Sequence, residues 1–179
     1  MNALTSGLTE LISGSFLQEG ALYLLSTVPG FPPIIQTVHI LGIAAVMASI
    51  VILDLRILGL AVPSQSISEM TRRLMPWLWW ALLCNALSGS VFVFARPNRY
   101  FSNPVFGWKF SFLIPAVLLT VLFHLLSRQE ADYWSATRQR VWTGKAIALL
   151  SLGLWIMVAM AGRWIAYSEY LYFPADEFL

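Results

Sequence analysis

Four long apolar stretches, separated by short polar connections, dominate the hydrophobic pattern of this chain. Each stretch holds about 20 residues, the length of an α-helix that crosses the hydrocarbon core of a bilayer. The expected spans cover approximately residues 33–53, 74–95, 104–127 and 146–167. The connections of 8 to 20 residues leave no room for a separate soluble domain. We therefore expect an all-α protein in which residues 33–167 form one four-helix transmembrane bundle.

Composition agrees with this pattern and excludes several classes of protein. Hydrophobic residues make up 58% of the 179 residues, and the mean hydropathy is +0.71, far from the profile of a soluble domain. The single cysteine, Cys84, has no partner for a disulfide within the chain, and the absence of a CxxCH motif excludes covalent c-type haem. No phosphate-binding loop, nucleophile elbow or zinc-protease motif is present, and nothing supports a nucleic-acid partner.

The N-terminal segment, residues 1–32, differs from a cleaved signal peptide. It contains no Lys or Arg and carries Glu10 and Glu19, whereas a signal peptide begins with basic residues. Its leucines recur at helical spacing against polar residues, a pattern typical of a short helix that lies in the membrane interface. We expect a retained interfacial helical segment before the bundle. An acidic aromatic tail, residues 168–179, follows it.

The distribution of Lys and Arg predicts the orientation of the chain. Seven of the eleven basic residues fall between spans one and two or between spans three and four, and four fall on the opposite side. Basic residues favour the cytoplasm, so we expect a multi-pass protein of the bacterial inner membrane with both termini on the periplasmic side. Asp54 and Arg56 are expected to anchor the cytoplasmic end of the first span at the membrane surface.

Two histidines and a lysine lie inside predicted spans, where such groups are costly and often functional: His39, Lys109 and His124. At 1.5 Å per residue, His39 lies about 9 Å and Lys109 about 8 Å from the outer ends of their spans. His124 follows Lys109 by 15 residues on one helix, about 22 Å along its axis. One haem between the two histidines is therefore not expected. His124 either hydrogen-bonds a neighbouring helix or belongs to a second site.

The outer half of the bundle gathers the groups that a b-type haem needs. His39 offers an axial nitrogen, Lys109 offers a cation for a propionate, and further candidates are Gly42, Gly89, Arg96, Met160 and Arg163. The glycines are expected to leave room for a planar ring. Other interpretations remain open: Lys109 and Arg163 can extend to the outer interface, and Met160 can simply fill the core.

Short motifs within residues 33–167 resemble an uncharacterised bacterial family of four-helix membrane proteins. The motifs are HILG at 39–42, DLRILGL at 54–60, YFSNPVFGWK at 100–109, FH at 123–124 and GRWIAY at 162–167. This resemblance covers about three quarters of the chain and implies the four-helix fold, but it brings no assigned activity.

A more distant similarity concerns chemistry. A histidine in an early span, a lysine at the start of a later one and a histidine 15 residues further on are similar to the HemJ type of protoporphyrinogen oxidase. That resemblance implies haem b, with His39 as axial ligand and Lys109 on a propionate or a substrate carboxylate. A weaker similarity to CopD-like membrane proteins implies copper, with His39, Met47 and Met160 as ligands.

Three hypotheses follow. The first is a haem b protein, a membrane oxidoreductase that transfers electrons or oxidises a membrane-soluble substrate; its second axial ligand is Met160, water or a residue of a neighbouring protomer. The second is a copper or small-solute transport component. The third is a cofactor-free accessory subunit of a membrane complex. Assembly into a homo-oligomer or a larger membrane complex fits all three.

Overall fold

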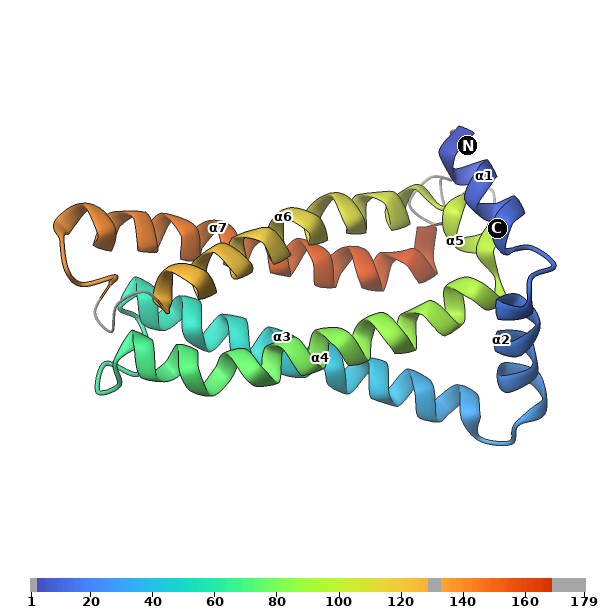
Figure 1. The fold of residues 1–179 in the computed structure, drawn as a ribbon, viewed down its shortest axis with the longest axis horizontal. Helices are drawn as coiled ribbons and strands as arrows, with labels where there is room; N and C mark the ends of the chain where they lie inside the picture. The colour runs from blue at the N-terminus through green and yellow to red at the C-terminus, as the bar shows by residue number, and fades with distance from the viewer. Residues whose placement is uncertain (1–2, 129–132, 169–179) are drawn as a thin grey trace, which may run out of the picture.

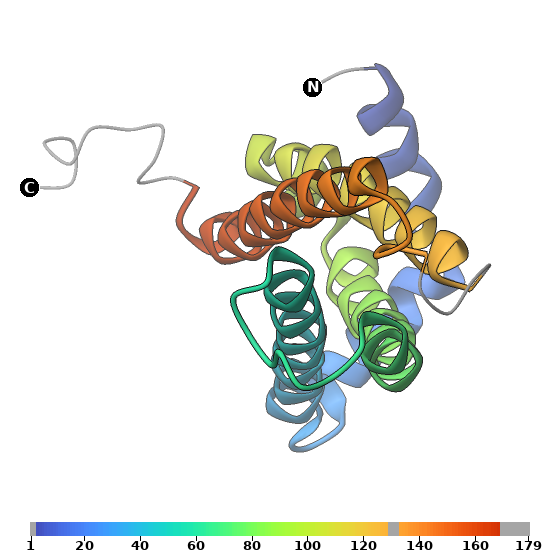
Figure 2. The same cartoon turned by 90° about the vertical axis from the view of Figure 1, so that its left-hand side faces the viewer.

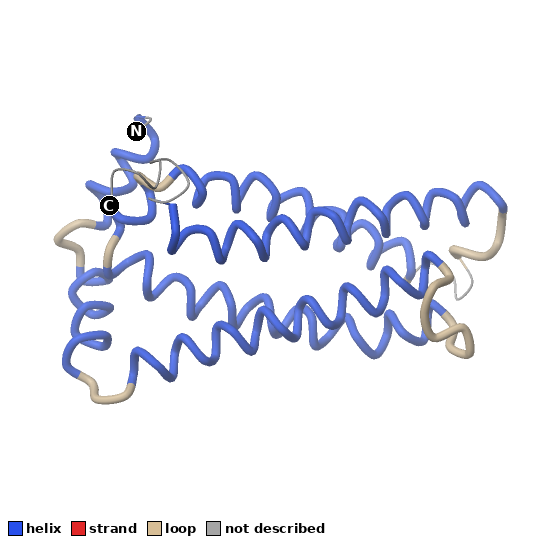
Figure 3. The backbone as a smooth tube through the Cα atoms, turned by 180° about the vertical axis from the view of Figure 1, so that it is seen from behind, coloured by secondary structure: helices blue, strands red, loops and turns tan. Residues whose placement is uncertain are grey.

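The computed structural model describes residues 3–128 and 133–168 and contains helices and no strand within those ranges (Figure 3). The helices are α1 (Ala3–Ile12), α2 (Phe16–Thr27), α3 (Phe31–Leu58), α4 (Ile67–Ala95), α5 (Pro97–Phe101), α6 (Pro104–Ser127) and α7 (Arg138–Trp164), followed by the 3₁₀ turn η1 (Ile165–Tyr167). The predicted all-α class is confirmed. Apart from Ser168, the predicted acidic tail lies outside the described residues.

Four of these helices, α3, α4, α6 and α7, form an antiparallel bundle (Figure 1). Each is long and apolar enough to cross a membrane, and no more than 33% of each apolar segment is buried within the chain. Large side chains such as Trp77, Trp80 and Leu118 lie on that exposed surface. A water-soluble protein rarely exposes so much contiguous apolar area, whereas a bilayer covers it. The chain is therefore a multi-pass membrane protein.

The ends of the long helices are set by capping residues and extend beyond most of the predicted spans. Gly30 and Gly59 flank α3 in the left-handed conformation, with φ of 77° and 84°, which a residue with a side chain rarely adopts. Helix α4 begins seven residues before the predicted position 74, and α7 begins eight before position 146. Hydropathy finds the segment inside the membrane, but caps decide where the helix starts.

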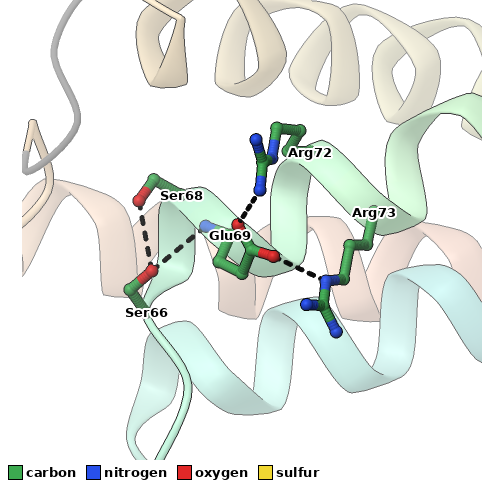
Figure 4. Close-up of polar contacts among 5 residues, drawn as sticks. All are labelled: Ser66, Ser68, Glu69, Arg72 and Arg73. Atoms are coloured by element: carbon green, nitrogen blue, oxygen red, sulfur yellow. Dashed lines mark hydrogen bonds and ion pairs between the residues drawn. The ribbon is translucent and has the colours of Figure 1, made fainter.

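The start of α4 shows how such a cap is built (Figure 4). The hydroxyl of Ser66 accepts the backbone N–H of Glu69 at 3.1 Å. The Glu69 carboxylate in turn accepts hydrogen bonds from Nη2 of Arg72 at 2.5 Å and from Nε of Arg73 at 2.6 Å. This N-cap with a carboxylate in the first turn satisfies orphan backbone donors and complements the helix dipole. Helix α4 therefore starts in a polar turn outside the apolar part of the span.

The buried core lies in the part of the bundle nearer the α3–α4 and α6–α7 connections. Its buried side chains include Val46, Ile50, Leu53, Met75, Leu78, Ala116, Phe123, Ala148 and Trp155. Ala116 and Ala148 are completely buried, so small residues allow close helix approach, as is usual between membrane helices. The principal contacts join α3 to α4, α6 to α7 and α3 to α7, whereas α4 and α6 contact each other little (Figure 2).

Two short helices, α1 and α2, precede the bundle, where the sequence predicted one helical segment. They lie at the end of the bundle that also holds α5 and η1, with α2 packed on α4 and α1 on α5 (Figure 1). Leu11, Phe16 and Leu17 are exposed. This end is called the α5 end below, and the end with the α3–α4 and α6–α7 connections is called the connection end.

Candidate functional site

His39 on α3 is held by a hydrogen-bond chain that runs into α4. Its Nδ1 lies 2.7 Å from Oγ of Ser88, which is almost completely buried. The Ser88 hydroxyl in turn donates to the backbone carbonyl of Cys84 at 2.6 Å. A serine hydroxyl has one proton, so an oxygen that donates to Cys84 accepts from Nδ1–H of His39. The lone pair of the histidine is then on Nε2, the nitrogen that can bind a metal.

Two glycines make room for side chains at this layer. A Cβ atom at Gly89 would lie 3.1 Å from Cε1 of His39, and one at Gly42 would lie 2.9 Å from Oδ1 of Asn85. The space that the missing side chains leave is therefore occupied by His39 and Asn85, rather than open to a planar ring as expected. Asn85 Oδ1 is buried and has no hydrogen-bond partner among the described residues. The sequence assigned neither Ser88 nor Asn85 a role toward His39 or a ligand.

Lys109 reaches the same layer from α6. Its ammonium group lies 3.8 Å from the position that a Cβ atom of Gly162 on α7 would occupy, so the lysine lies against that helix. The Lys109 charge is near enough to act on the His39 ring. Among the described residues, the ion pairs are those of Glu69 at the connection end. The site thus holds an imidazole and a cation without a paired carboxylate.

Three other predicted residues lie toward the surface. Arg163 donates to the Tyr167 hydroxyl at 2.9 Å, and its guanidinium lies 4.9 Å from the centre of that ring. Met160 is exposed, and Arg96 is an exposed residue between α4 and α5. Within the described residues, no hydrogen bond or ion pair joins any of them to His39. They can contact a ligand at the edge of the site, but they do not build its interior.

The rim at the α5 end also carries Tyr100. Burial raises the pKa of the Tyr100 phenol, while the neighbouring Arg99 and Arg96 act in the opposite direction. The phenol therefore keeps its proton and stays a hydrogen-bond donor next to two guanidinium groups. This rim is positively charged and suits the carboxylates of a ligand.

His124 stands apart from this layer, as the sequence predicted. It belongs to the last turn of α6, at the connection end, 15 residues beyond Lys109 and about 22 Å along the helix. Its ring packs edge-on against Trp79, with centroids 6.2 Å apart, and its Nδ1 is buried without a partner among the described residues. His39 and His124 are therefore parts of different environments.

An apolar groove between α2, α3 and α4 reaches the candidate site from the side. Its volume is about 560 Å³, and its lining includes Leu17, Val38, Leu87 and Phe94 together with Ser88. Small-molecule sites in proteins occupy about 300–1,000 Å³. Ser88 belongs both to this lining and to the hydrogen bond with His39, so the groove ends against the residue that holds the histidine.

Metal ligands are sparse in the part of the chain that the structure describes. No group of three or more His, Cys, Asp or Glu side chains comes together there. Cys84 is exposed, and of the methionines expected for copper, Met47 is half-buried and Met160 exposed. The described His, Cys, Asp and Glu side chains therefore offer no closed set of ligands for a bare ion.

Comparison with known proteins adds one finding. The sequence model of a family of unknown function, DUF6644, matches residues 16–168, which span α2 through η1. The chain belongs to the DUF6644 family. No curated protein and no solved structure matches the chain. The matched region of this DUF6644 protein contains all the candidate residues described above, from His39 to Arg163.

Proposed function

We propose that this DUF6644 protein binds haem b in the half of its bundle near the α5 end and serves as an electron-transfer protein or an oxidase of a membrane-soluble substrate. The observation that carries the proposal is the chain from His39 Nδ1 through Ser88 to the Cys84 carbonyl. In metal sites, a histidine ligand commonly donates a hydrogen bond from the ring nitrogen that does not bind the metal, and His39 Nδ1 makes such a bond to Ser88. His39 presents Nε2 as the axial nitrogen.

The small number of metal-binding side chains near His39 favours haem over a bare metal ion. A zinc or copper site needs three or four protein ligands, and no such cluster exists among the described residues. A porphyrin supplies the equatorial nitrogens itself, so one histidine is enough to hold its iron. When bound, haem provides one-electron redox chemistry. Met160, water or a residue of another protomer remains the proposed second axial ligand.

Lys109 supports an anionic ligand at the same site. Its charge lies near His39 and is not paired with a carboxylate within the described residues. An uncompensated cation inside a membrane span is expensive, and a propionate would neutralise it. Arg96 and Arg163 lie at the rim, where they would contact a second propionate. The groove beside Ser88 gives apolar molecules from the bilayer a route to this layer.

The membrane setting is part of the proposal. The protein would lie in a bacterial inner membrane with the α5 end, and thus both termini, on the periplasmic side. Most basic residues of the long helices and their connections lie at the connection end, as cytoplasmic residues would. Pairing into a homo-oligomer or a larger complex would cover exposed aromatic side chains such as Trp77 and Trp80.

The test is to purify the protein from haem-replete membranes and to measure its absorption spectrum, pyridine haemochrome and metal content. A Soret band with iron in proportion to haem is expected. Copper without a porphyrin spectrum contradicts the proposal and supports the transport component instead. Protein that contains neither haem nor metal contradicts it as well, and co-purification with a larger complex would then support the accessory subunit.

A second experiment tests whether Lys109 binds a haem propionate. K109M removes the cation beside His39, whereas K145M removes a lysine that lies over the Trp142 ring at the connection end. Haem affinity should fall in K109M and stay at the wild-type value in K145M. Equal affinities in the two variants would remove Lys109 from the site.

A further inference from the structure

A second buried ionisable group lies in the other half of the bundle. Asp54 on α3 is only 4% exposed, although the sequence placed it at the membrane surface. The reason is that α3 continues to Leu58, so Asp54 is still one turn inside the helix and faces α6 and α7. It follows His39 by 15 residues, about 22 Å along the axis. Asp54 is therefore separate from the proposed haem site.

The Asp54 carboxyl group lines a small internal cavity. The cavity measures about 10 Å³, and Thr120 of α6 and Ser151 of α7 are the other polar residues on its wall. Oδ2 of Asp54 is buried without any hydrogen-bond partner among the described residues. A cavity of about 10–15 Å³ holds one water molecule, which would satisfy such an oxygen.

No cation faces Asp54 from the elements packed around it. Neither ion pair of the described residues involves Asp54. Charged and titratable groups of these helices are engaged elsewhere: Arg56 donates to the Gln65 carbonyl, Arg72 and Arg73 bind Glu69, Arg140 lies over Tyr133, Lys145 lies over Trp142 and His124 packs on Trp79. An ionised carboxylate in this position would be a buried charge without a partner, which is strongly unfavourable in a membrane interior.

The cavity has too few oxygen ligands for a bound metal ion to neutralise an ionised Asp54 carboxylate. The Thr120 hydroxyl donates a hydrogen bond to the Ala116 carbonyl at 2.9 Å and accepts one from Nε1–H of Trp155 at 3.3 Å. One lone pair of the hydroxyl oxygen is therefore already used. With Asp54 and Ser151, the cavity offers three side-chain oxygen groups, whereas calcium takes about six to eight oxygen ligands. A proton neutralises the carboxylate without further ligands.

We propose that Asp54 is a proton-binding site inside the bundle, a neutral carboxylic acid at neutral pH that exchanges its proton through one water molecule in the cavity lined by Thr120 and Ser151. Intramembrane carboxyl groups of this kind belong to proton pathways. The site holds an exchangeable proton on the connection side of the membrane and does not depend on whether haem binds at His39.

Infrared spectroscopy of the full-length protein in lipid vesicles tests the proposal. Carboxyl groups in water are ionised at neutral pH, so a C=O stretching band of a protonated acid there reports a buried one. Wild-type protein should show this band, and the band should shift in D₂O because its proton exchanges. It should disappear in D54N and keep its amplitude in E69Q, whose carboxylate binds two arginines at the surface (Figure 4).

The D54E variant retains an acid and covers the case in which D54N does not fold; its band should move in frequency. Absence of the band from wild-type protein at neutral pH overturns the proposal. Persistence of an unshifted band in D54N or D54E overturns it too, since the band then belongs to another residue. Loss of the band on addition of sodium at constant pH would show that the carboxylate binds a metal ion instead.

Discussion

Ser88 is the residue that orients the His39 ring. A histidine in a membrane span can bond to any nearby carbonyl, but the Ser88 hydroxyl is already committed to the Cys84 carbonyl and accepts from Nδ1. The neutral tautomer with a free Nε2 is the one that binds iron. Ser88 carries no sequence signal for this role, because serines in membrane helices commonly bond to their own backbone.

Replacement of Ser88 by alanine removes the acceptor for Nδ1–H and should weaken haem binding by about 10- to 100-fold, the usual cost of losing a group that orients a metal ligand. Haem titration of the purified apoprotein measures the change. Ser90 is the matched control, because its hydroxyl bonds only to the Leu87 carbonyl at 2.8 Å. If S90A weakens haem binding as much as S88A does, the orienting role assigned to Ser88 is wrong.

At the scale of helices, the sequence predicted the spans well and their ends less well. Hydropathy located all four long helices, and Pro104 marked the start of α6 correctly. The early starts of α4 and α7 depend on side-chain caps at Ser66 and Thr137, which lie outside the apolar windows.

The contents of the site were predictable only in part. The sequence predicted that His39 and Lys109 share a layer, because the depth of a residue in a straight helix equals its number of residues from the helix end times the rise per residue. The direction in which a side chain faces was not predictable, since it depends on how the helices rotate against each other. For that reason Met160 and Arg163 are found at the surface, Asp54 in the core, and Asn85 against Gly42.

Packing of the α6–α7 connection depends on one glycine. Trp134 stacks on Phe123 with ring centres 4.9 Å apart and donates to Ser127 at 2.8 Å, and its Cε3 lies 2.9 Å from where a Cβ of Gly144 would stand. An added methyl group must displace a ring that is held on two sides, and such overpacking costs about 1–3 kcal/mol.

G144A should therefore melt at a lower temperature than wild-type protein in detergent, as followed by circular dichroism. G153A lies on the same helix and is the control, because nothing stands within 4 Å of its added Cβ. Its melting temperature should not decrease. An unchanged melting temperature in G144A would mean that Trp134 can move aside without loss.

At the scale of the whole molecule, the two ends of the bundle differ in charge and in contents. The connection end carries seven of the eleven basic residues and the Asp54 cavity, whereas the α5 end carries His39, Lys109 and the positively charged rim. If the protein handles both electrons and protons, these sites lie in opposite halves of the membrane. The direction of transfer then depends on the orientation of the chain.

Fusion reporters measure that orientation. Alkaline phosphatase fused after Leu179 should be active, because the enzyme folds only in the periplasm, and a fluorescent protein fused at the same place should be dark. The reverse pattern should appear for fusions placed in the α3–α4 connection. An inactive phosphatase at Leu179 with a bright fluorescent fusion would invert the proposed orientation, although the fold would be unaffected.

Haem content of paired histidine variants tests the haem site most directly. Wild-type protein, H39A and H124A would be purified from the same haem-replete membranes, and their haem would be measured per chain by pyridine haemochrome. We predict that H39A loses its haem, while H124A, altered about 22 Å along α6 from Lys109, retains the wild-type amount. Haem retained in H39A, or lost from H124A alone, would contradict a haem site at His39.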